Sequence, residues 1–170
     1  MKNEEIIKNF IEKDNYYYES KNSNLSCVDN KLYSYNTIIG QKIDNKIIIN
    51  FNKFSNTTAR HIHRLCQYAN NNYYSIIFAP TSLNAKAFDP SIVLGKFNTL
   101  LYFYAYHFNR KKDRQTFIEL YKNLILFAGI YPSCFYDNGA NQTFYIEEII
   151  QDHEPNFKKA VNLKKGVNND

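Results

Sequence analysis

The stretch that decides the fold runs from residue 38 to residue 51 and reads Ile-Ile-Gly-Gln-Lys-Ile-Asp-Asn-Lys-Ile-Ile-Ile-Asn-Phe. Its two apolar runs are rich in isoleucine, a residue that favours strands. Between them lies Asp44-Asn45, a pair that tolerates the positive φ angles of a tight turn. The stretch therefore predicts an antiparallel β-hairpin.

The residues on either side of this hairpin extend the pattern. Upstream, the first fifteen residues predict an amphipathic helix, and residues 16–18, 25–28 and 32–39 are rich in strand-forming residues. Downstream, the hydroxyl and amide side chains of residues 55–58 predict the start of a helix that continues through residues 59–69. A further strand is predicted at residues 73–78.

The second half of the chain has helical periodicity. Asp89-Pro90 predicts the beginning of a helix that reaches residue 108, and a second helix is predicted from about residue 114 to residue 127. The link between them, residues 109–113, is short enough for an antiparallel helical hairpin. The expected class is α+β, with an antiparallel sheet mostly from the N-terminal half packed against helices, and a C-terminal helical hairpin. Residues 1–160 are expected to form one domain and residues 161–170 a frayed polar tail.

Composition limits the classes of protein to consider. The chain has 170 residues, of which 44% are hydrophobic and 16% aromatic, which excludes a disordered polyelectrolyte. Its net charge of +5 leaves anionic partners open and argues against a mimic of nucleic acid. No apolar run approaches the roughly 20 residues of a membrane span, and acidic residues interrupt the N-terminal segment. The expected location is the cytoplasm of a host cell, with no membrane partner.

The residue types that carry catalysis or bind metals do not form a recognisable set. His61 and His63 are two residues apart, so a helix would turn their side chains about 200° from each other. The three cysteines are scattered and form no Cys-x-x-Cys motif. We therefore predict no metal, no cofactor and no enzymatic activity.

Two basic segments are candidate binding sites. The first is the predicted helix start, where hydroxyl groups and cations could hold a phosphate or a carboxylate: Ser55, Thr57, Thr58, Arg60, His61 and Arg64. The alternative is that the hydroxyl groups only cap the helix. The second is the predicted loop that carries Arg110, Lys111, Lys112 and Arg114, which could contact phosphates. The alternative there is a solvated loop.

Tyrosine is the third candidate feature, with 15 residues beside 13 phenylalanines and no tryptophan. Successive strand residues point to opposite faces, so some tyrosines must reach the surface. The aromatic surface candidates are Tyr16, Tyr17, Tyr18 and Tyr73. Exposed tyrosines could bind a protein or stack on bases. The alternative is that an AT-rich genome supplies tyrosine codons.

Part of the chain resembles a family of small uncharacterised proteins encoded by bacteriophages and plasmids of AT-rich bacteria. The family pattern is a Ser-Tyr-Asn-Thr strand, an aliphatic strand, and a helix that starts with Tyr-Ser-x-Thr-Thr-x-x-His. Here the pattern corresponds to residues 34–37, 47–50 and 54–61, with Phe54 in place of the tyrosine and Ala59-Arg60 where Ser-Lys is commoner. The resemblance covers about a fifth of the chain.

The resemblance implies a mobile-element origin and brings no established activity. It also implies that the motif residues form one structural unit: Asn36, Thr37, Ser55, Thr57, Thr58 and His61. Within that unit, Asn36 or Thr37 is expected to form a hydrogen bond to the start of the helix.

The leading functional hypothesis is a non-catalytic binding protein of a phage or mobile element. It would act by occluding a host protein or ribonucleoprotein, as anti-CRISPR proteins and other antagonists of host defence do. The first alternative is direct binding of nucleic acid through the basic segments. The second alternative is a small enzyme that acts on a phosphorylated or nucleotide substrate, with His61 as its acid or base.

Overall fold

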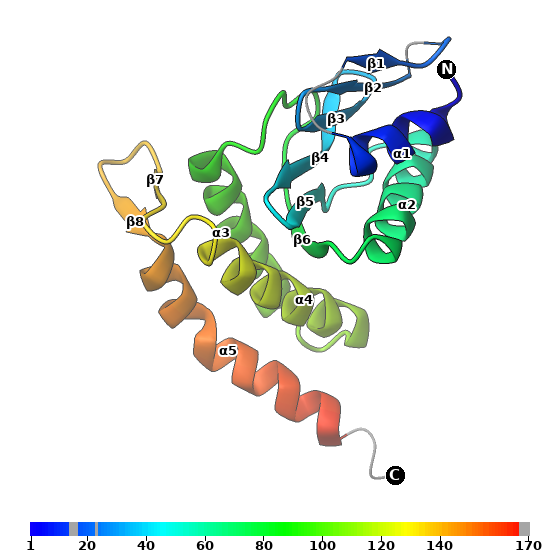
Figure 1. Cartoon of the computed structure of the whole chain (residues 1–170). Helices are drawn as coiled ribbons and strands as arrows, with labels where there is room; N and C mark the ends of the chain where they lie inside the picture. Colours follow the sequence, from blue (N-terminus) through cyan, green and yellow to red (C-terminus); the bar gives the residue numbers. More distant parts are fainter. Residues whose placement is uncertain (14–16, 23, 167–170) are drawn as a thin grey trace. The chain divides into compact units, whose positions relative to one another are not determined.

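The computed structural model describes residues 1–13, 17–22 and 24–166 and divides the chain into two compact units (Figure 1). Unit 1 is Met1–Phe88 and unit 2 is Asp89–Asp170. The division falls within the range that the sequence analysis treats as a single domain. The α+β class is confirmed, with a sheet from the N-terminal half and helices in the C-terminal half.

Unit 1 is built around a six-stranded sheet whose spatial order follows the order of the chain. The first five strands are antiparallel, and the last is parallel to its neighbour because a helix intervenes between them. The strands are β1 (Tyr18–Glu19), β2 (Leu25–Val28), β3 (Lys31–Ser34), β4 (Thr37–Ile43), β5 (Lys46–Asn50) and β6 (Ser75–Ala79). The predicted hairpin is β4–β5, and Asp44 has the positive φ of 52° that its turn requires.

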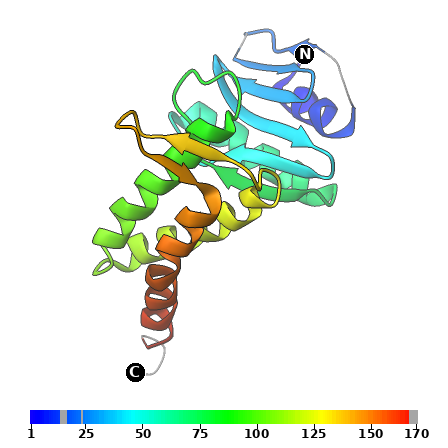
Figure 2. The ribbon, with the colours of Figure 1, turned by 90° about the vertical axis from the view of Figure 1, so that its left-hand side faces the viewer.

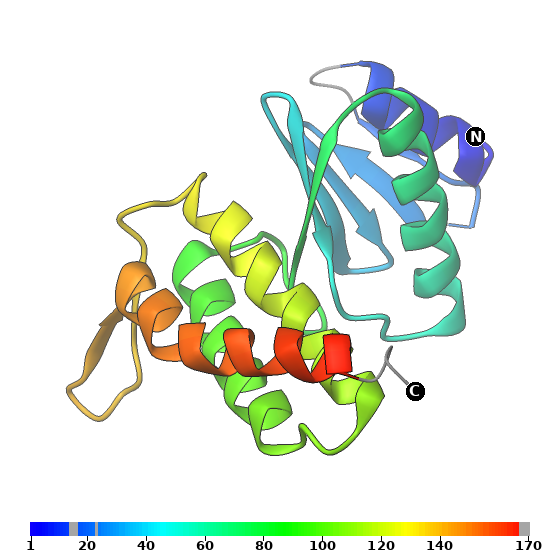
Figure 3. The same ribbon diagram turned by 90° about the horizontal axis from the view of Figure 1, so that it is seen from below.

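Two helices, α1 (Asn3–Glu12) and α2 (Asn56–Asn71), cover one face of this sheet, as Figure 3 shows. The predicted apolar face of α1 is buried together with residues from four strands and from α2. The helix α2 lies close to the sheet at Gly40, where an added Cβ atom would be 2.7 Å from Cδ2 of Leu65. The core of unit 1 therefore depends on a glycine under the middle of α2.

Three strand predictions need correction. The run 32–39 is not one strand, because Tyr35 has a φ of 53° and turns the chain between β3 and β4. The Ser-Tyr-Asn-Thr motif is thus a hairpin turn instead of a strand. Similarly, β6 begins at Ser75, because Tyr73 has a left-handed backbone with a φ of 60°. Of the predicted strand 16–18, only Tyr18 belongs to β1, while Tyr16 lies outside the described residues.

Unit 2 contains the predicted antiparallel helical hairpin, formed by α3 (Pro90–Tyr106) and α4 (Lys111–Ala128). A small β-hairpin, β7 (Phe135–Asp137) with β8 (Thr143–Tyr145), lies beside α3, and α5 (Ile146–Gly166) follows it (Figure 2). Residues 161–166, expected in a frayed tail, continue α5, and residues 167–170 lie outside the described part. None of the helices in the described part of the chain combines the length and apolar character that a membrane crossing requires.

Candidate functional site

The predicted site at the start of α2 separates into a buried part and an exposed part. Ser55 is the N-cap residue, and its Oγ accepts a hydrogen bond of 3.1 Å from the backbone N–H of Thr58. Thr58 and His61 turn inward and are buried. Arg60 and Arg64 are exposed on the other side of the helix, and Thr57 is half-buried. The six residues therefore do not form one site.

The buried part is a chain of hydrogen bonds that joins α1, β3 and α2. Ser55 Oγ donates to Thr58 Oγ1 at 3.0 Å, and Thr58 Oγ1 lies 3.2 Å from Ser34 Oγ. Ser34 Oγ is in turn 2.9 Å from Nδ1 of His61, whose Nε2 is 3.0 Å from the side-chain amide nitrogen of Asn3. The three buried side chains in this chain, Ser34, Thr58 and His61, thereby each have a hydrogen-bond partner.

The hydroxyl that reaches the helix start belongs to Ser34, so the expected bond from Asn36 or Thr37 is not found. Asn36 is exposed, and Thr37 Oγ1 instead accepts a hydrogen bond of 2.9 Å from the backbone of Asn84. The reason is the turn at Tyr35: Ser34 is the last residue of β3 and faces α2. The motif does form a unit, through its first residue.

The order Ser34, His61, Asn3 resembles the nucleophile, base and orienting group of a hydrolase. However, the amide nitrogen of Asn3 donates to Nε2, so the proton of a neutral His61 is on Nδ1 and points at Ser34, where a base would need a free lone pair. Ser34 is also 1% exposed and His61 3% exposed, so a substrate has no access to either side chain. Burial lowers the pKa of His61, and the nearby charge of Arg64 lowers it further. A neutral His61 with both ring nitrogens bonded is suited to holding the three elements together.

The exposed part of α2 contains a shallow hollow of about 400 Å³ lined by Asn56, Ala59, Arg60, His63 and Arg64. The two arginines are one helical turn apart, and within the described residues neither has a carboxylate in ion-pair distance. The sequence of α2 also lacks Asp and Glu. The hollow is therefore cationic, and it includes His63, which the sequence analysis left out of the site.

The second predicted site is not a loop, because α4 begins at Lys111 with Arg110 as its N-cap residue. The predicted start near residue 114 was too late, since Lys and Arg favour helices and nothing in residues 111–114 interrupts one. The basic residues therefore occupy the first turn of α4. They are held directly after α3, where the backbone of Arg110 donates to the carbonyl of His107.

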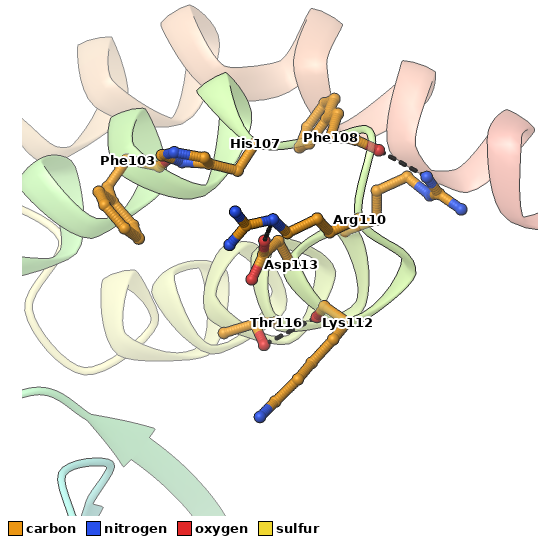
Figure 4. A network of polar contacts seen from close by, with 8 residues as sticks. Phe103, His107, Phe108, Arg110, Lys112, Asp113 and Thr116 are labelled. Carbon is orange, nitrogen blue, oxygen red and sulfur yellow. Dashed lines mark hydrogen bonds and ion pairs between the residues drawn. The ribbon is translucent and has the colours of Figure 1, made fainter.

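The four cations in this turn have different partners, as Figure 4 shows in part. Arg114 donates to the carbonyl oxygen of Phe108 and so helps to close the end of α3. Arg110 lies 3.9 Å from Asp113, with its side chain 71% exposed. Lys111 and Lys112 are exposed, and in the described part of the chain their ammonium groups have no carboxylate partner. Three of the four cations thus remain available to a ligand.

Two exposed aromatic rings are in the last turn of α3, which precedes these cations in the chain. Phe103 is 55% exposed and Tyr106 is 88% exposed. The ring of His107 packs against both, with centroid distances of 4.7 Å and 5.4 Å. We call this surface the aromatic–basic corner and define it by Phe103, Tyr106, Arg110, Lys111 and Lys112.

The sequence analysis missed the two rings, although the sequence holds a signal for them. The buried residues of α3 include Val93, Phe97 and Leu101, whose spacing marks one face of the helix. Phe103 and Tyr106 do not share that spacing and fall on the opposite face. Periodicity within α3 could therefore have identified them as exposed.

The predicted aromatic surface residues are dispersed. Tyr73 is 95% exposed in the turn before β6. Tyr17 is 66% exposed and donates a hydrogen bond of 2.8 Å to Glu19, which raises the pKa of Tyr17. Tyr18 is half-buried, with the Lys13 ammonium 5.8 Å from its ring centroid, and Tyr16 lies outside the described residues. These tyrosines do not form a common cluster.

A buried polar cluster in unit 2 was also missed by sequence reasoning. The side-chain amide of Asn98 donates to the hydroxyl of Tyr136 at 2.8 Å, and its oxygen lies 2.9 Å from Nε2 of His153. His153 is fully buried, and its Nδ1 has no hydrogen-bond partner among the described residues. Burial lowers the pKa of His153, although the nearby Asp152 acts in the opposite direction. The cluster connects α3, β7 and α5 around a neutral histidine.

Metal-binding and thiol chemistry find little support in the side chains. In residues 1–13, 17–22 and 24–166, no three His, Cys, Asp or Glu residues are grouped so that they could hold a metal ion. Burial raises the pKa of the half-buried thiols Cys66 and Cys134, and that of Cys27 to about 11. These thiols are therefore protonated at neutral pH and are poor nucleophiles.

Comparison with known proteins gives a match for the first part of the chain. Residues 3–79 match the model of a family described as a family of unknown function (DUF8033). No curated protein and no solved structure matches the chain. The matched residues include α1, the whole sheet, α2 and the buried network around His61. Unit 1 is thus similar to this family, and the aromatic–basic corner lies outside the match.

Proposed function

We propose that the chain is a non-catalytic binding protein that occludes an anionic partner, a protein or a ribonucleoprotein, through the aromatic–basic corner of unit 2. The observation that carries the proposal is the combination found there. Two exposed rings at the end of α3 and three exposed cations at the start of α4 flank the same short connection between the helices, and Asp113 is the acidic residue of the first turn of α4.

The position of the cations supports a role in binding, because it is unfavourable for the helix. The N-terminus of a helix carries the positive end of its dipole, where acidic side chains stabilise and basic ones destabilise. Arg110, Lys111 and Lys112 all lie at this end of α4, and Arg110 makes no side-chain capping hydrogen bond. Residues that oppose local stability are found most often at functional sites.

The exposed rings support the proposal for a separate reason. Aromatic side chains offer a large, rigid contact area, and together with arginine they dominate the energetics of binding surfaces. The burial of Phe103 and Tyr106 in a complex would remove apolar surface from water. The cations of the corner therefore attract an anionic partner over a distance, and its rings provide contact area once the partner is bound.

The resemblance in unit 1 favours a particular kind of partner. If the chain comes from a phage or another mobile element, a host defence complex is a suitable target, and the protein would act in the host cytoplasm as an anti-CRISPR-like antagonist. This part of the proposal rests on the resemblance, while the binding role rests on the corner.

The alternatives receive less support from the geometry. An enzyme that uses His61 would need access to a side chain that is 3% exposed. Binding of nucleic acid through α2 would use the cationic hollow at Arg60 and Arg64, whose lining contains the imidazole of His63 but no Phe or Tyr. The corner offers a cation and a ring together, and for this reason we prefer it.

The test is affinity capture from host lysate with the tagged chain and two variants, each with and without nuclease. The double variant Lys111→Glu/Lys112→Glu reverses the charge of the corner, and Lys122→Glu changes an exposed lysine farther along α4 as a control. We expect a stoichiometric partner that the double variant loses and the control keeps. Retention of the same partner by all three proteins would contradict the proposal.

A further inference from the structure

We infer that the aromatic–basic corner binds single-stranded nucleic acid directly, with bases stacked on Phe103 and Tyr106 and phosphates held by Arg110, Lys111 and Lys112. The inference rests on the proposed function and gives a chemical class to the surface that the corner contacts. In a ribonucleoprotein, that surface is an exposed stretch of unpaired strand.

The rings are arranged so that neighbouring bases can use both of them. Phe103 and Tyr106 are three residues apart on α3, which corresponds to about 4.5 Å along the helix axis. The ring of His107 packs against both rings and so restricts their movement. Their exposed faces are free to stack, and stacking is tolerant of base identity because every base has a π-face.

The cations follow the rings directly in the chain. Arg110 is separated from Tyr106 by four positions, and Figure 4 shows its side chain extending back toward the end of α3 that carries Phe103 and His107. Its ion pair with Asp113 has a distance of 3.9 Å and is exposed to solvent, so a phosphate can replace the carboxylate at little cost. Lys111 and Lys112 add two further charges in the first turn of α4, and in Figure 4 the Lys112 side chain extends away from Arg110 and Phe103, so Lys112 would contact a more distant phosphate of the strand.

The alternation of ring and cation favours an unpaired strand over the other anionic partners. A single strand presents a flat base and a phosphate in every nucleotide, and proteins bind it with aromatic platforms in a positively charged surface. A duplex keeps its bases stacked on each other, so Phe103 and Tyr106 would have no base to contact. An acidic protein surface would satisfy the cations, but its carboxylates would leave both rings without a stacking partner.

The test measures fluorescence anisotropy of labelled 15-nucleotide oligo(U), oligo(dT) and a duplex of the same length with the full chain. We expect binding of at least one single strand and weaker binding of the duplex. For three phosphate contacts, the logarithm of the affinity should fall with the logarithm of the salt concentration with a slope of about −2. Binding of oligo(U) alone would identify RNA as the source of the strand. Equal binding of oligo(U) and oligo(dT) would show that the corner does not distinguish ribose from deoxyribose.

Matched variants separate the contribution of the corner from general charge and hydrophobicity. Phe103→Ala and Tyr106→Ala should each lower the affinity about tenfold. Phe135→Ala removes a ring that is 51% exposed on β7 and should leave the affinity unchanged. Lys111→Glu/Lys112→Glu should abolish binding and Lys122→Glu should not. Circular dichroism spectra should be the same for all variants, since the substituted side chains are exposed.

Two results would overturn the inference. One is no binding of either single strand at 50 mM salt, a condition that strengthens phosphate contacts. The other is an equal loss of affinity in Phe103→Ala and Phe135→Ala. If the oligonucleotides do not bind but the charge-reversed variant still loses its partner from lysate, the proposed function stands and this inference falls. If the charge-reversed variant keeps both the oligonucleotide and the partner from lysate, the proposed function and this inference are both wrong.

Discussion

His61 is the residue on which the arrangement of unit 1 depends most. Its two ring nitrogens contact Ser34 on β3 and Asn3 on α1, while its backbone belongs to α2. Three elements that are distant in sequence therefore meet at one side chain. The buried position requires that the imidazole be neutral and that its partners keep their hydrogen bonds.

We predict that His61→Leu destabilises unit 1 by about 1–3 kcal/mol, because Ser34 and Asn3 would each lose a hydrogen bond and Ser34 would keep only its contact with Thr58. The matched control is His63→Leu, two residues away on the exposed side of α2, where the change should stay within about 0.5 kcal/mol. Urea-dependent hydrogen exchange in peptides from α2 and β3 measures both. Equal effects of the two substitutions would contradict the structural role of His61.

The buried histidines also predict a dependence of stability on pH. Burial lowers the pKa of both His61 and His153 below the usual 6.5. As the pH falls below that value, the unfolded chain binds protons that the folded chain does not, so stability decreases. Both units should be at full stability above about pH 6.5 and lose it progressively below.

Thermal unfolding between pH 7.5 and pH 5.5 checks this prediction, followed by circular dichroism. The midpoint should fall as the medium becomes more acidic, and His63→Asn should leave that trend intact because His63 is exposed. A midpoint that rises or stays constant over this range would show that the two histidines are not held in the neutral form.

Sequence reasoning identified His61 but could not identify its partners. The cap at Ser55 follows from local spacing, since its bond reaches three residues along the chain. The bond between Ser34 and His61 spans 27 residues, and the bond between Asn3 and His61 spans 58. Such contacts depend on how the strands and helices pack, which the local pattern does not determine.

At the scale of elements, the first turn of α4 combines a cost in stability with the proposed binding role. Reversal of the charges should therefore raise the stability of unit 2 and weaken binding at the same time. We predict that Lys111→Glu and Lys112→Glu each stabilise unit 2 by about 0.3–1 kcal/mol, because an acidic side chain interacts favourably with the positive end of the helix dipole. The same substitutions should weaken binding to the partner.

Urea unfolding of the variants checks the gain in stability, and affinity capture checks the loss of binding. Lys122→Glu is the control for both, since the effect of the dipole is confined to the first turn. If the corner variants were less stable than the unmodified chain, Lys111 and Lys112 would stabilise unit 2. The premise that their charges destabilise the start of α4 would then be wrong.

The elements themselves were predictable where the signal is local. The turn at Asp44, the cap at Ser55 and the Asp89-Pro90 start each depend on neighbouring residues, and each is found. The turn at Tyr35 was missed because tyrosine rarely adopts a positive φ and its neighbours favour strands. The start of α4 was missed because a cluster of charged residues is equally typical of a solvated loop and of the first turn of a helix.

For the whole molecule, the family match and the proposed binding surface fall in different units. The family match ends at residue 79, within unit 1, and the aromatic–basic corner belongs to unit 2. The buried network around His61 lies inside the match, as a scaffold shared by a family would require. The corner lies outside the match, so the proposed binding role does not depend on the family.

The segment that leads from β6 to the end of unit 1 is fixed to the sheet, although it contains neither helix nor strand. The backbone of Ile38 donates to the carbonyl of Ala85 at 2.8 Å, and the backbone of Asn84 donates to Thr37 Oγ1 at 2.9 Å. The hydroxyl of Tyr33 donates to the carbonyl of Lys86 at 2.9 Å. Residues 84–86 are therefore held to the sheet of unit 1 by hydrogen bonds.

We predict that trypsin cleaves slowly after Lys86 in the native protein, although the lysine side chain is exposed. The carbonyl of the bond to be cut is the one that Tyr33 holds, so a protease must first open the segment. Tyr33→Phe removes this hydrogen bond and should accelerate cleavage about two- to tenfold.

The control is Tyr73→Phe, at a tyrosine that is 95% exposed, which should not change the rate of cleavage. Mass spectrometry of the fragments 1–86 and 87–170 over time measures it. Rapid cleavage in the unmodified chain, unaffected by Tyr33→Phe, would show that the hydrogen bond from Tyr33 does not hold this segment to the sheet.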